Sequence, residues 1–279
     1  MKLLADLISF ENISRYECDG IIVSDADFSC FPERTFTYEE TERIAGYCQE
    51  KNLLCVLNID RIIEEGELSF LFAKLDKYLR LGIDYYIFSD YSVFSYFRKK
   101  GEEKRLIYDP KTLITNYEDA VFYKNLGIKV SISNELSLEE ILAVSEAGNC
   151  VFEIYGHHQI FYSRRPLLTN YCKYSGLQLK PENTLFHLQE ETRTDKYPIF
   201  QSKHGTFVYT PYRYALFTEL TNLKEKLIFG RINTAFISEE EALHIISLYK
   251  EALAGDDMKI KFFSERLKEI NPNIARGFL

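Results

Sequence analysis

VFEIYGHHQIFYSRRPLLTNY, residues Val151–Tyr171, is the stretch from which the rest of this chain is best interpreted. It begins as a strand, because β-branched and aromatic residues fill most of its first five positions, and Gly156 ends that run. Two adjacent histidines follow, and the stretch continues through an aromatic run into Ser163-Arg164-Arg165-Pro166. Polar groups just beyond a strand end are typical of sites in α/β proteins. The stretch therefore predicts a functional site, although each arginine could instead pair with an acidic helix elsewhere in the chain.

The composition is that of a folded protein with a sizeable core. The chain has 279 residues, of which 46% are hydrophobic and 15% aromatic. This length suits one large α/β domain, with or without a small appendage. The net charge of −8 argues against direct binding to a nucleic-acid backbone, which requires a basic surface. No run of about 18 apolar residues is present, and Asp6 interrupts the apolar start, so we expect neither a membrane span nor a signal peptide.

The six cysteines lie at positions 18, 30, 48, 55, 150 and 172 and form no CxxC pair. Several stand inside apolar segments, as Cys55 does in LLCVLNI. This usage is typical of reduced core residues, and it predicts a cytoplasmic protein.

Short apolar segments alternate with amphipathic helical segments along the chain. Seven segments are predicted to be strands: Leu3–Leu7, Gly20–Ser24, Leu53–Asn58, Asp84–Ser89, Arg105–Tyr108, Ile128–Ser133 and Cys150–Tyr155. Most are apolar on both faces, as buried parallel strands are. Capping boxes at Thr37, Ser137 and Ser238 predict the starts of three helices. Seven strand–helix steps predict a TIM-like (β/α)8 barrel; the alternative, an open doubly wound sheet, is disfavoured because no glycine-rich nucleotide fingerprint follows an early strand.

The last third of the chain departs from that rhythm. We expect the eighth strand near Arg231–Ile237, RINTAFI. Before it, Asn183–Leu188 and Thr206–Thr210 have the character of antiparallel strands, and Lys203–Thr206 supplies a turn. We therefore expect a single barrel domain over residues 1–279, possibly irregular, with a small antiparallel hairpin or lid-like insertion over residues 173–210 after strand seven.

The carboxyl ends of the strands carry the functional groups of a (β/α)8 barrel. Here those ends carry acidic and amide side chains: Asp25, Asn58, Asp60, Asp90, Asp109, Asn134 and Glu135. Glu153 lies inside an apolar strand, where a carboxylate needs a partner, so it either pairs with Arg164 or Arg165 or points into the barrel mouth. His157 and His158 face opposite ways on an extended chain, so at most one is expected in the site.

Such a rim could perform acid–base chemistry, hold a metal or bind a charged peptide. No HExxH-like spacing favours a metal, so no metal ligand is assigned. The aspartates, Asp90 among them, could instead cap the helices that follow them.

Several of these residues resemble a known family. Gly156–Tyr171 is similar to the signature of the U32 peptidase family, also called collagenase-like proteases, which runs from a strand and a glycine through Tyr-Ser and Arg into Leu-Leu-Ser/Thr. Three further stretches resemble family segments: Ser133–Ile141, Thr115-Asn116, and Tyr197–Ile199 together with His204–Thr206. The resemblance thus covers most of the chain.

The resemblance implies a TIM-like barrel and a peptidase that acts on a peptide or protein substrate by an undefined mechanism. On this hypothesis Glu135, Glu153 and His157 are the catalytic acid–base residues, and Arg164 and Arg165 hold a substrate carboxylate or an oxyanion. The other predicted substrate-binding residues are Tyr162, Ser163, Asn116 and Asp90.

Some members of the family resemble cluster-dependent hydroxylases of RNA bases or quinone precursors, which use two cysteines within the signature. Gln159 and Pro166 stand at the matching positions here. Because an iron–sulfur cluster needs about four thiolates, we expect none in this chain, and no other cofactor. Two alternatives to a peptidase follow. One is a non-catalytic accessory barrel that binds a family paralogue or forms a homo-oligomer, and the other is an RNA-modification paralogue without its own cluster.

Overall fold

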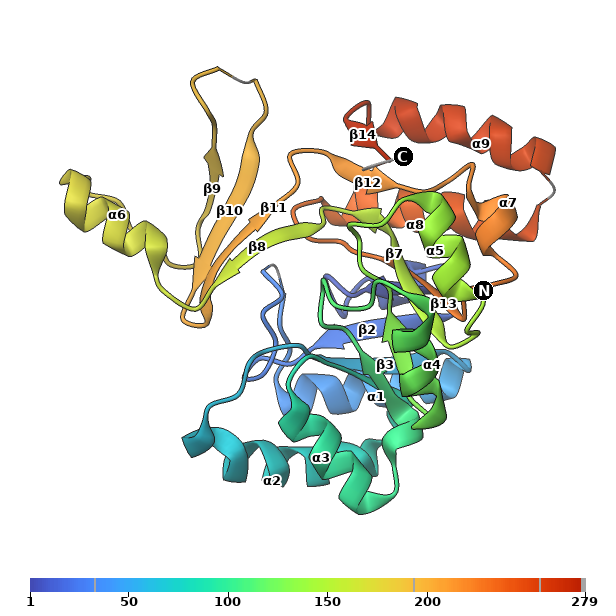
Figure 1. Ribbon diagram of the computed structural model, residues 1–279, viewed down its shortest axis with the longest axis horizontal. Helices are drawn as coiled ribbons and strands as arrows, with labels where there is room; N and C mark the ends of the chain where they lie inside the picture. The colour runs from blue at the N-terminus through green and yellow to red at the C-terminus, as the bar shows by residue number, and fades with distance from the viewer. Residues whose placement is uncertain (33, 193, 256, 277–279) are drawn as a thin grey trace.

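Eight parallel strands close into a barrel in the computed structural model, which describes residues 1–276 except residues 33, 193 and 256 (Figure 1). The barrel strands are β1 (Lys2–Asp6), β2 (Gly20–Ser24), β3 (Leu54–Ile59), β4 (Tyr85–Phe88), β5 (Leu106–Tyr108), β6 (Lys129–Ser131), β7 (Cys150–Gly156) and β13 (Phe229–Ile232). Each pairs with the next, and β13 pairs with both β7 and β1, which closes the ring. The TIM-like barrel expected from the sequence is confirmed.

A ring of apolar side chains fills the lower part of the barrel interior. Seven of the eight strands contribute one buried residue each: Leu4, Ile22, Val56, Ile87, Ile107, Val151 and Phe229. Alternate residues of a strand point to opposite sides, so the remaining apolar residues face outward. There they pack against the helices in the main core. This burial on both faces explains why the strands are apolar over most of their length.

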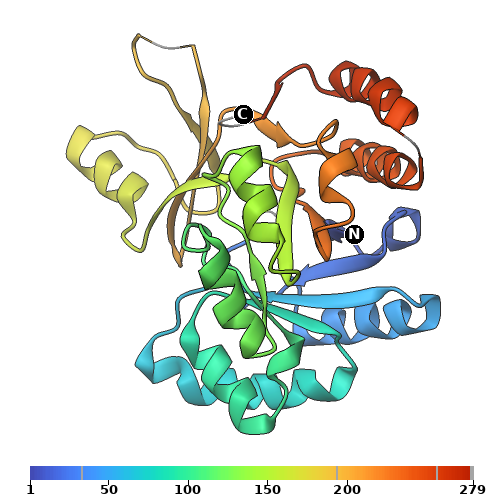
Figure 2. The ribbon, with the colours of Figure 1, turned by 45° about the vertical axis from the view of Figure 1, so that its right-hand side comes forward.

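Helices follow most strands and cover the outside of the barrel (Figure 2). They are α1 (Tyr38–Lys51), α2 (Leu68–Tyr78), α3 (Tyr91–Lys100), α4 (Tyr117–Asn125), α5 (Leu138–Ser145) and α8 (Glu239–Ala254), with short 3-10 helices η1 (Ile13–Arg15), η2 (Glu65–Glu67), η3 (Leu79–Leu81) and η4 (Glu103–Arg105). The predicted caps Thr37, Ser137 and Ser238 each accept a backbone N–H at the third helical position. These starts are therefore confirmed.

An antiparallel sheet stands beside the barrel and is inserted between β7 and β13. It contains β8 (Gln159–Ser163), β9 (Leu185–Leu188), β10 (Tyr197–Ser202) and β11 (Gly205–Tyr209) in the order β8-β11-β10-β9, and α6 (Leu167–Ser175) packs on one face. We call residues 159–209 the lobe. Figure 1 shows α6 and the β9–β10 hairpin projecting away from the barrel. The predicted turn at Lys203-His204 joins β10 to β11, and the first strand of the sheet, β8, precedes the range 173–210 in which we expected an insertion.

The eighth barrel strand lies slightly earlier than predicted. Asn233 ends it, because the Asn233 side chain accepts the backbone N–H of Ala235 and turns the chain, and Phe236 then adopts a left-handed conformation with φ 62°. Two short elements, β12 (Arg213–Ala215) and α7 (Leu220–Leu223), lie between the lobe and β13, and α9 (Asp257–Ile270) and β14 (Ile274–Ala275) follow α8 at the end of the described chain.

Candidate functional site at the barrel mouth

A polar layer lies directly above the apolar ring in the barrel. Because side chains two residues apart in a strand share a face, the position two residues beyond each ring member also points inward. Those positions are occupied by Asp6, Ser24, Asn58, Ser89, Asp109, Glu153 and Arg231. The change from apolar to polar residues thus occurs at one level in seven strands. It creates a charged floor at the mouth, on the side where barrel enzymes carry their sites.

Arg231 is the centre of this floor. Its guanidinium donates from Nε to Asp6 Oδ2 at 3.0 Å and from Nη2 to Asp6 Oδ1 at 2.9 Å, and Nη1 lies 3.6 Å from Asp109 Oδ2. Both Arg231 and Asp6 are buried. Burial raises the pKa of Asp6 to about 6, against the opposing effect of Arg231. The pKa of Arg231 is raised, because the surrounding carboxylates outweigh the effect of burial.

Lys111 brings a second cation to the mouth from the loop after β5. Its Nζ lies 2.8 Å from Asp109 Oδ2 and 3.7 Å from Asp60 Oδ2. Burial would raise the pKa of Asp109, but Lys111 and Arg231 outweigh it and the pKa is lowered. The pKa of Lys111 is raised for the converse reason, because Asp109 and Asp60 outweigh its burial. Lys111 itself has a left-handed backbone with φ 68°.

Glu153 resembles Asp6, and differs from Asp109, in that the effect of burial on its pKa exceeds that of the nearby cations. Its pKa is raised by burial, in spite of the nearby charges of Arg231 and Lys111. Asn233 donates from Nδ2 to Glu153 Oε1 at 3.1 Å, and His158 Nε2 lies 3.5 Å from the same oxygen. Burial also lowers the pKa of His158 to about 3, so its imidazole is neutral. Glu153 therefore faces a neutral amide and a neutral ring, an environment in which a carboxyl can retain a proton.

Two adjoining cavities open above the floor. A small cavity of about 30 Å³ is lined by Glu153, Arg231, Lys111 and Asn233, among others. An outer pocket of about 280 Å³ shares Lys111 with it and is walled by lobe residues that include Tyr162 and Phe207. The ring of Tyr162 stacks on that of Phe207 with centroids 5.0 Å apart. The mouth is thus a polar pocket under an aromatic roof that the lobe supplies.

The structure separates the three predicted catalytic residues. Glu153 points into the mouth rather than toward Arg164 or Arg165. His157 is buried, but its side chain points away from Glu153. Its Nδ1 lies 2.7 Å from the carbonyl oxygen of Thr210. Glu135 is exposed, and its neighbour Asn134 is the residue that lines the small cavity.

Of the predicted substrate-binding residues, some line the mouth and others lie away from it. Tyr162 lines the outer pocket. Ser163 accepts the backbone N–H of Arg165, and the exposed Arg164 pairs with the exposed Glu64 at the edge of the lobe.

Two further predicted residues, Asp90 and Asn116, cap helices. Asp90 accepts the backbone N–H of Ser92 at the start of α3, and Asn116 accepts that of Asp119 at the start of α4. These contacts give both residues a structural role at the barrel rim.

Sequence inspection did not single out Arg231, Lys111, Asp6 or Asn233 as site residues. Arg231 and Asp6 are 225 positions apart, and their pairing appears only when β13 closes the barrel. The sequence held a usable indication for Asp6, a carboxylate two positions beyond Leu4 inside a predicted strand, but none for Arg231, which stood at the start of the predicted eighth strand.

The cysteines do not fit an iron–sulfur cluster held by this chain. Cys30 lines the mouth cavities, whereas Cys18, Cys48, Cys55 and Cys150 are buried in the main core and Cys172 lies in the lobe. A cluster needs about four thiolates close together. In the part of the chain that the structure describes, no group of three or more histidine, cysteine, aspartate or glutamate side chains could hold a metal ion. Nor does any described helix have the length and apolar character needed to cross a bilayer.

Comparison with known proteins shows what this chain is similar to. The chain is 27% identical over 261 residues to tRNA hydroxylation protein P2 of Bacillus subtilis (strain 168), an alignment that covers 87% of this chain and 84% of that protein. It is also 24% identical over 111 residues to a collagenase of Porphyromonas gingivalis, where the alignment covers 40% of this chain but only 26% of the collagenase.

The fold agrees with a solved relative. The structure of a U32 peptidase superposes with a TM-score of 0.51 at 13% identity, covering 84% of this chain and 92% of that one. The sequence model of peptidase family U32 matches residues 6–278, nearly the whole chain. The resemblance seen in the signature is therefore confirmed, and this chain belongs to peptidase family U32.

Proposed function

We propose that this chain takes part in tRNA hydroxylation and that the barrel mouth is its substrate site. The observation that carries the proposal is the similarity to tRNA hydroxylation protein P2, which extends over 87% of this chain. The likeness to the collagenase supports proteolysis less well, because it covers only about a quarter of that protein.

The mouth is suited to a small, polar, planar group. Asn134, Gln159 and Asn233 line the small cavity with amides that can both donate and accept hydrogen bonds. The aromatic roof offers a surface on which a base can stack. Arg231 and Lys111 are already neutralised by carboxylates, so the floor is a poor site for a phosphate group.

The role that we propose for the chain is to bind and position the base. Hydroxylation replaces a C–H bond by C–O–H and requires an oxidant, and the cysteines of this chain are not arranged to hold a redox cluster. The oxidising group therefore comes from a partner protein in this proposal. The net charge of −8 is consistent with a partner that also supplies much of the contact to the tRNA backbone.

Complementation tests the proposal directly. A Bacillus subtilis strain that lacks tRNA hydroxylation protein P2 would receive this chain, and its tRNA would be digested to nucleosides and analysed by mass spectrometry. We expect the nucleosides that carry one additional oxygen atom to return. Their continued absence, with the chain shown to be soluble in the cell, would contradict the proposal.

Two variants locate the site in the same assay. Glu153→Gln keeps the shape of the side chain but replaces the carboxyl that would bind the base, and we expect at least a tenfold loss of hydroxylated nucleosides, roughly the effect of losing one hydrogen bond to a charged group. Glu139→Gln is the matched control, because Glu139 is exposed in the first turn of α5. Equal losses in both variants would exclude a specific role of the mouth.

A peptidase remains the second candidate, and Glu153 is the observation that favours it. A carboxyl whose pKa is raised by burial can act as a general acid or base in peptide hydrolysis. The test is digestion of a peptide library by the purified chain, with and without a chelator, read by mass spectrometry. Cleavage that Glu153→Gln abolishes would favour hydrolysis, and sensitivity to the chelator would add a metal. Peptides that stay intact with the wild-type chain would count against this candidate.

A further inference from the structure

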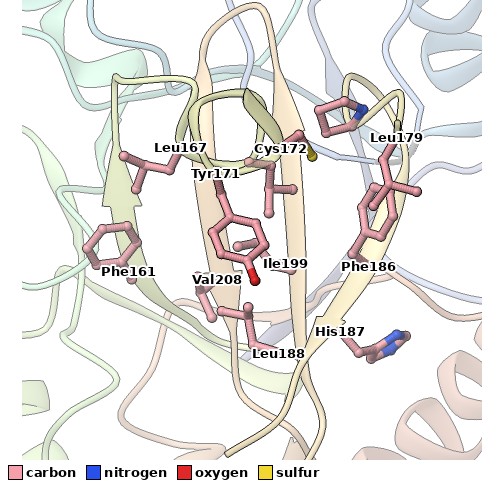
Figure 3. Close-up of a pocket in the computed structure, with 12 residues that line it drawn as sticks. Phe161, Leu167, Tyr171, Cys172, Leu179, Phe186, His187, Leu188, Ile199 and Val208 are labelled. Atoms are coloured by element: carbon pink, nitrogen blue, oxygen red, sulfur yellow. The ribbon is translucent and has the colours of Figure 1, made fainter. Parts of the chain in front are cut away.

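An apolar groove of about 540 Å³ crosses the outer face of the lobe, away from the barrel mouth. Figure 3 shows the ring of Tyr171 reaching from α6 into this groove, between Phe161 on β8 and Phe186 on β9. The groove is larger than either cavity at the mouth. The function proposed above does not use it.

Cross-strand pairing explains why this face is apolar. Phe161 pairs with Val208, Val208 with Ile199, and Ile199 with Phe186, so one row of apolar residues crosses all four strands. The next row, Tyr162–Phe207–Phe200–Leu185, points to the other face, toward the mouth. An antiparallel sheet with one face in water normally alternates apolar and polar residues. Here both faces are apolar, and α6 covers the outer one only in part.

The exposed apolar surface of the lobe is large enough for a protein interface. Eight of the sixteen large hydrophobic residues exposed in the described chain lie between positions 160 and 188. Ile160 lines the outer mouth pocket, and Leu185 belongs to the inner row; the other six are Phe161 on the outer row, two residues of α6, two of the segment after it, and Leu188 on β9. With roughly half of each side chain exposed, these six present on the order of 600 Å². One partner in a standard protein–protein interface contributes about 800 Å².

The unpaired edge of the sheet suggests where another chain binds to this surface. β9 pairs with β10 on one side and lies at the edge of the described sheet. Its sequence, Leu185-Phe186-His187-Leu188, contains neither a proline nor a charged side chain, which are the devices that normally keep edge strands from pairing. Leu188 is 45% exposed. An apolar, uncharged edge of this kind is a template for another strand.

We propose that a second copy of this chain binds at this edge, beside the groove, with the two β9 strands paired antiparallel about a two-fold axis. Antiparallel pairing of identical edge strands is a two-fold operation and therefore forms a closed dimer rather than a filament. The axis runs perpendicular to the sheet, so both outer faces lie on the same side. The two four-stranded sheets then become one continuous sheet, and the α6 helices flank its centre.

The dimer also acts on the mouth, because the lobe is shared between the two surfaces. The inner row supplies Phe207 and Tyr162 to the wall of the outer pocket. Pairing of β9 holds the sheet from its far edge and fixes this roof over the site. The proposal does not depend on which reaction the mouth supports.

Sedimentation of the full chain tests the proposal, at concentrations from about 1 to 100 µM so that a weak dimer is populated. We expect a dimer that dissociates on dilution. Leu188→Lys places a charge on the edge, and we expect it to raise the dissociation constant at least tenfold, roughly the effect of losing one central interface residue. Leu113→Lys is the matched control, because Leu113 is 62% exposed but lies in the loop after β5. It should leave the dimer intact.

Hydrogen exchange gives a readout that needs no substitution. Amides of residues 185–188 should exchange more slowly at the high concentration than at the low one, while those of the barrel strands should not change. A wild-type chain that stays monomeric throughout would overturn the proposal, even if another protein were found on the groove. A dimer that Leu188→Lys leaves unchanged, without concentration-dependent protection of β9, would overturn it as well.

Discussion

The barrel mouth and the lobe break the usual distribution of residues in opposite ways. The mouth removes charged side chains from water, and Arg231, Asp6 and Asp109 are all buried there. The lobe leaves apolar side chains in water, such as Tyr174, which is 92% exposed. Each charge at the mouth has an opposite charge within reach inside the same chain. The described residues cover the apolar face of the lobe only in part, and the second copy proposed above binds at its edge. The mouth thus pairs its charges within the chain, whereas the lobe keeps apolar surface exposed.

Removal of Arg231 should have the largest effect on stability. Arg231→Met preserves most of the side-chain volume but leaves the Asp6 carboxylate buried without its partner. Breaking a buried ion pair from one side typically costs about 3 to 5 kcal/mol, and for a chain of this length we expect the Tm to fall by roughly 10 °C. Urea unfolding and thermal unfolding measure the change. Arg15→Met is the control, because Arg15 and Glu240 form an exposed pair, and little change is expected there.

A second variant separates loss of the pair from loss of packing. Adding Asp6→Asn to Arg231→Met removes the unpaired carboxylate, so the double variant should recover part of the lost stability. If the double variant were less stable than the single one, the cause would be lost packing, and the mouth would not differ electrostatically from the rest of the core.

Acid should unfold the protein over a defined range of pH because two buried histidines are neutral. Burial lowers the pKa of His157 to about 4 and that of His158 to about 3. The unfolded chain therefore binds more protons than the folded chain below pH 6.5, and stability falls as the pH falls from 6.5 toward 4. Asp6 acts in the opposite sense. Its raised pKa favours the folded state at low pH, a contribution that is lost as the pH rises through about 6. The combined contribution of these three groups between pH 6.5 and 4.5 should be a loss of roughly 3 kcal/mol.

Urea unfolding at several pH values measures this slope. His158→Phe can keep the stacking on Tyr214, where the ring centroids are 4.2 Å apart, but it cannot bind a proton, so the slope should become shallower. His244→Phe is the control, because His244 is exposed, and its slope should equal that of the wild type. An unchanged slope in His158→Phe would mean that His158 is already charged in the folded protein.

Gly156 lies between the barrel and the lobe, and its replacement should change the free energy of unfolding less than the loss of Arg231 does. It ends β7 with φ 132°, and an added Cβ would lie 2.6 Å from the carbonyl oxygen of Asn233. Gly156→Ala should therefore cost roughly 2 kcal/mol and displace the Asn233 amide from Glu153. Gly46→Ala in α1 is the control with the opposite sign, because no atom lies within 4 Å of its added Cβ and alanine favours a helix. Chemical unfolding of both variants measures the difference, and a stabilised Gly156→Ala would show that the end of β7 can relax.

The same contrast explains what could be predicted from the sequence. Local patterns decide the barrel strands and the helix caps, so apolar runs and residues such as Thr37 and Ser137 were sufficient. Glu153 can be identified as a candidate site residue from the sequence because a carboxylate inside an apolar strand needs a partner. Arg231 and Asp6 were missed because their meaning depends on a pairing over 225 positions. The eighth strand begins earlier than the prediction, and it includes Gly230, whose missing side chain allows Ile154 and Met1 to pack closely.

The smallest effect on stability is expected at the edge of the lobe, from Arg164. Its ion pair with Glu64 is exposed on both sides, with 55% and 58% of the two side chains accessible. In a double-mutant cycle of Arg164→Ala and Glu64→Ala, the coupling energy should be below about 1 kcal/mol and should vanish in high salt. Arg165→Ala is the neighbouring control and should leave stability nearly unchanged, because Arg165 is also exposed. A coupling as large as that of Arg231 with Asp6 would mean that charges, and not the apolar row and a partner copy, hold the lobe over the mouth.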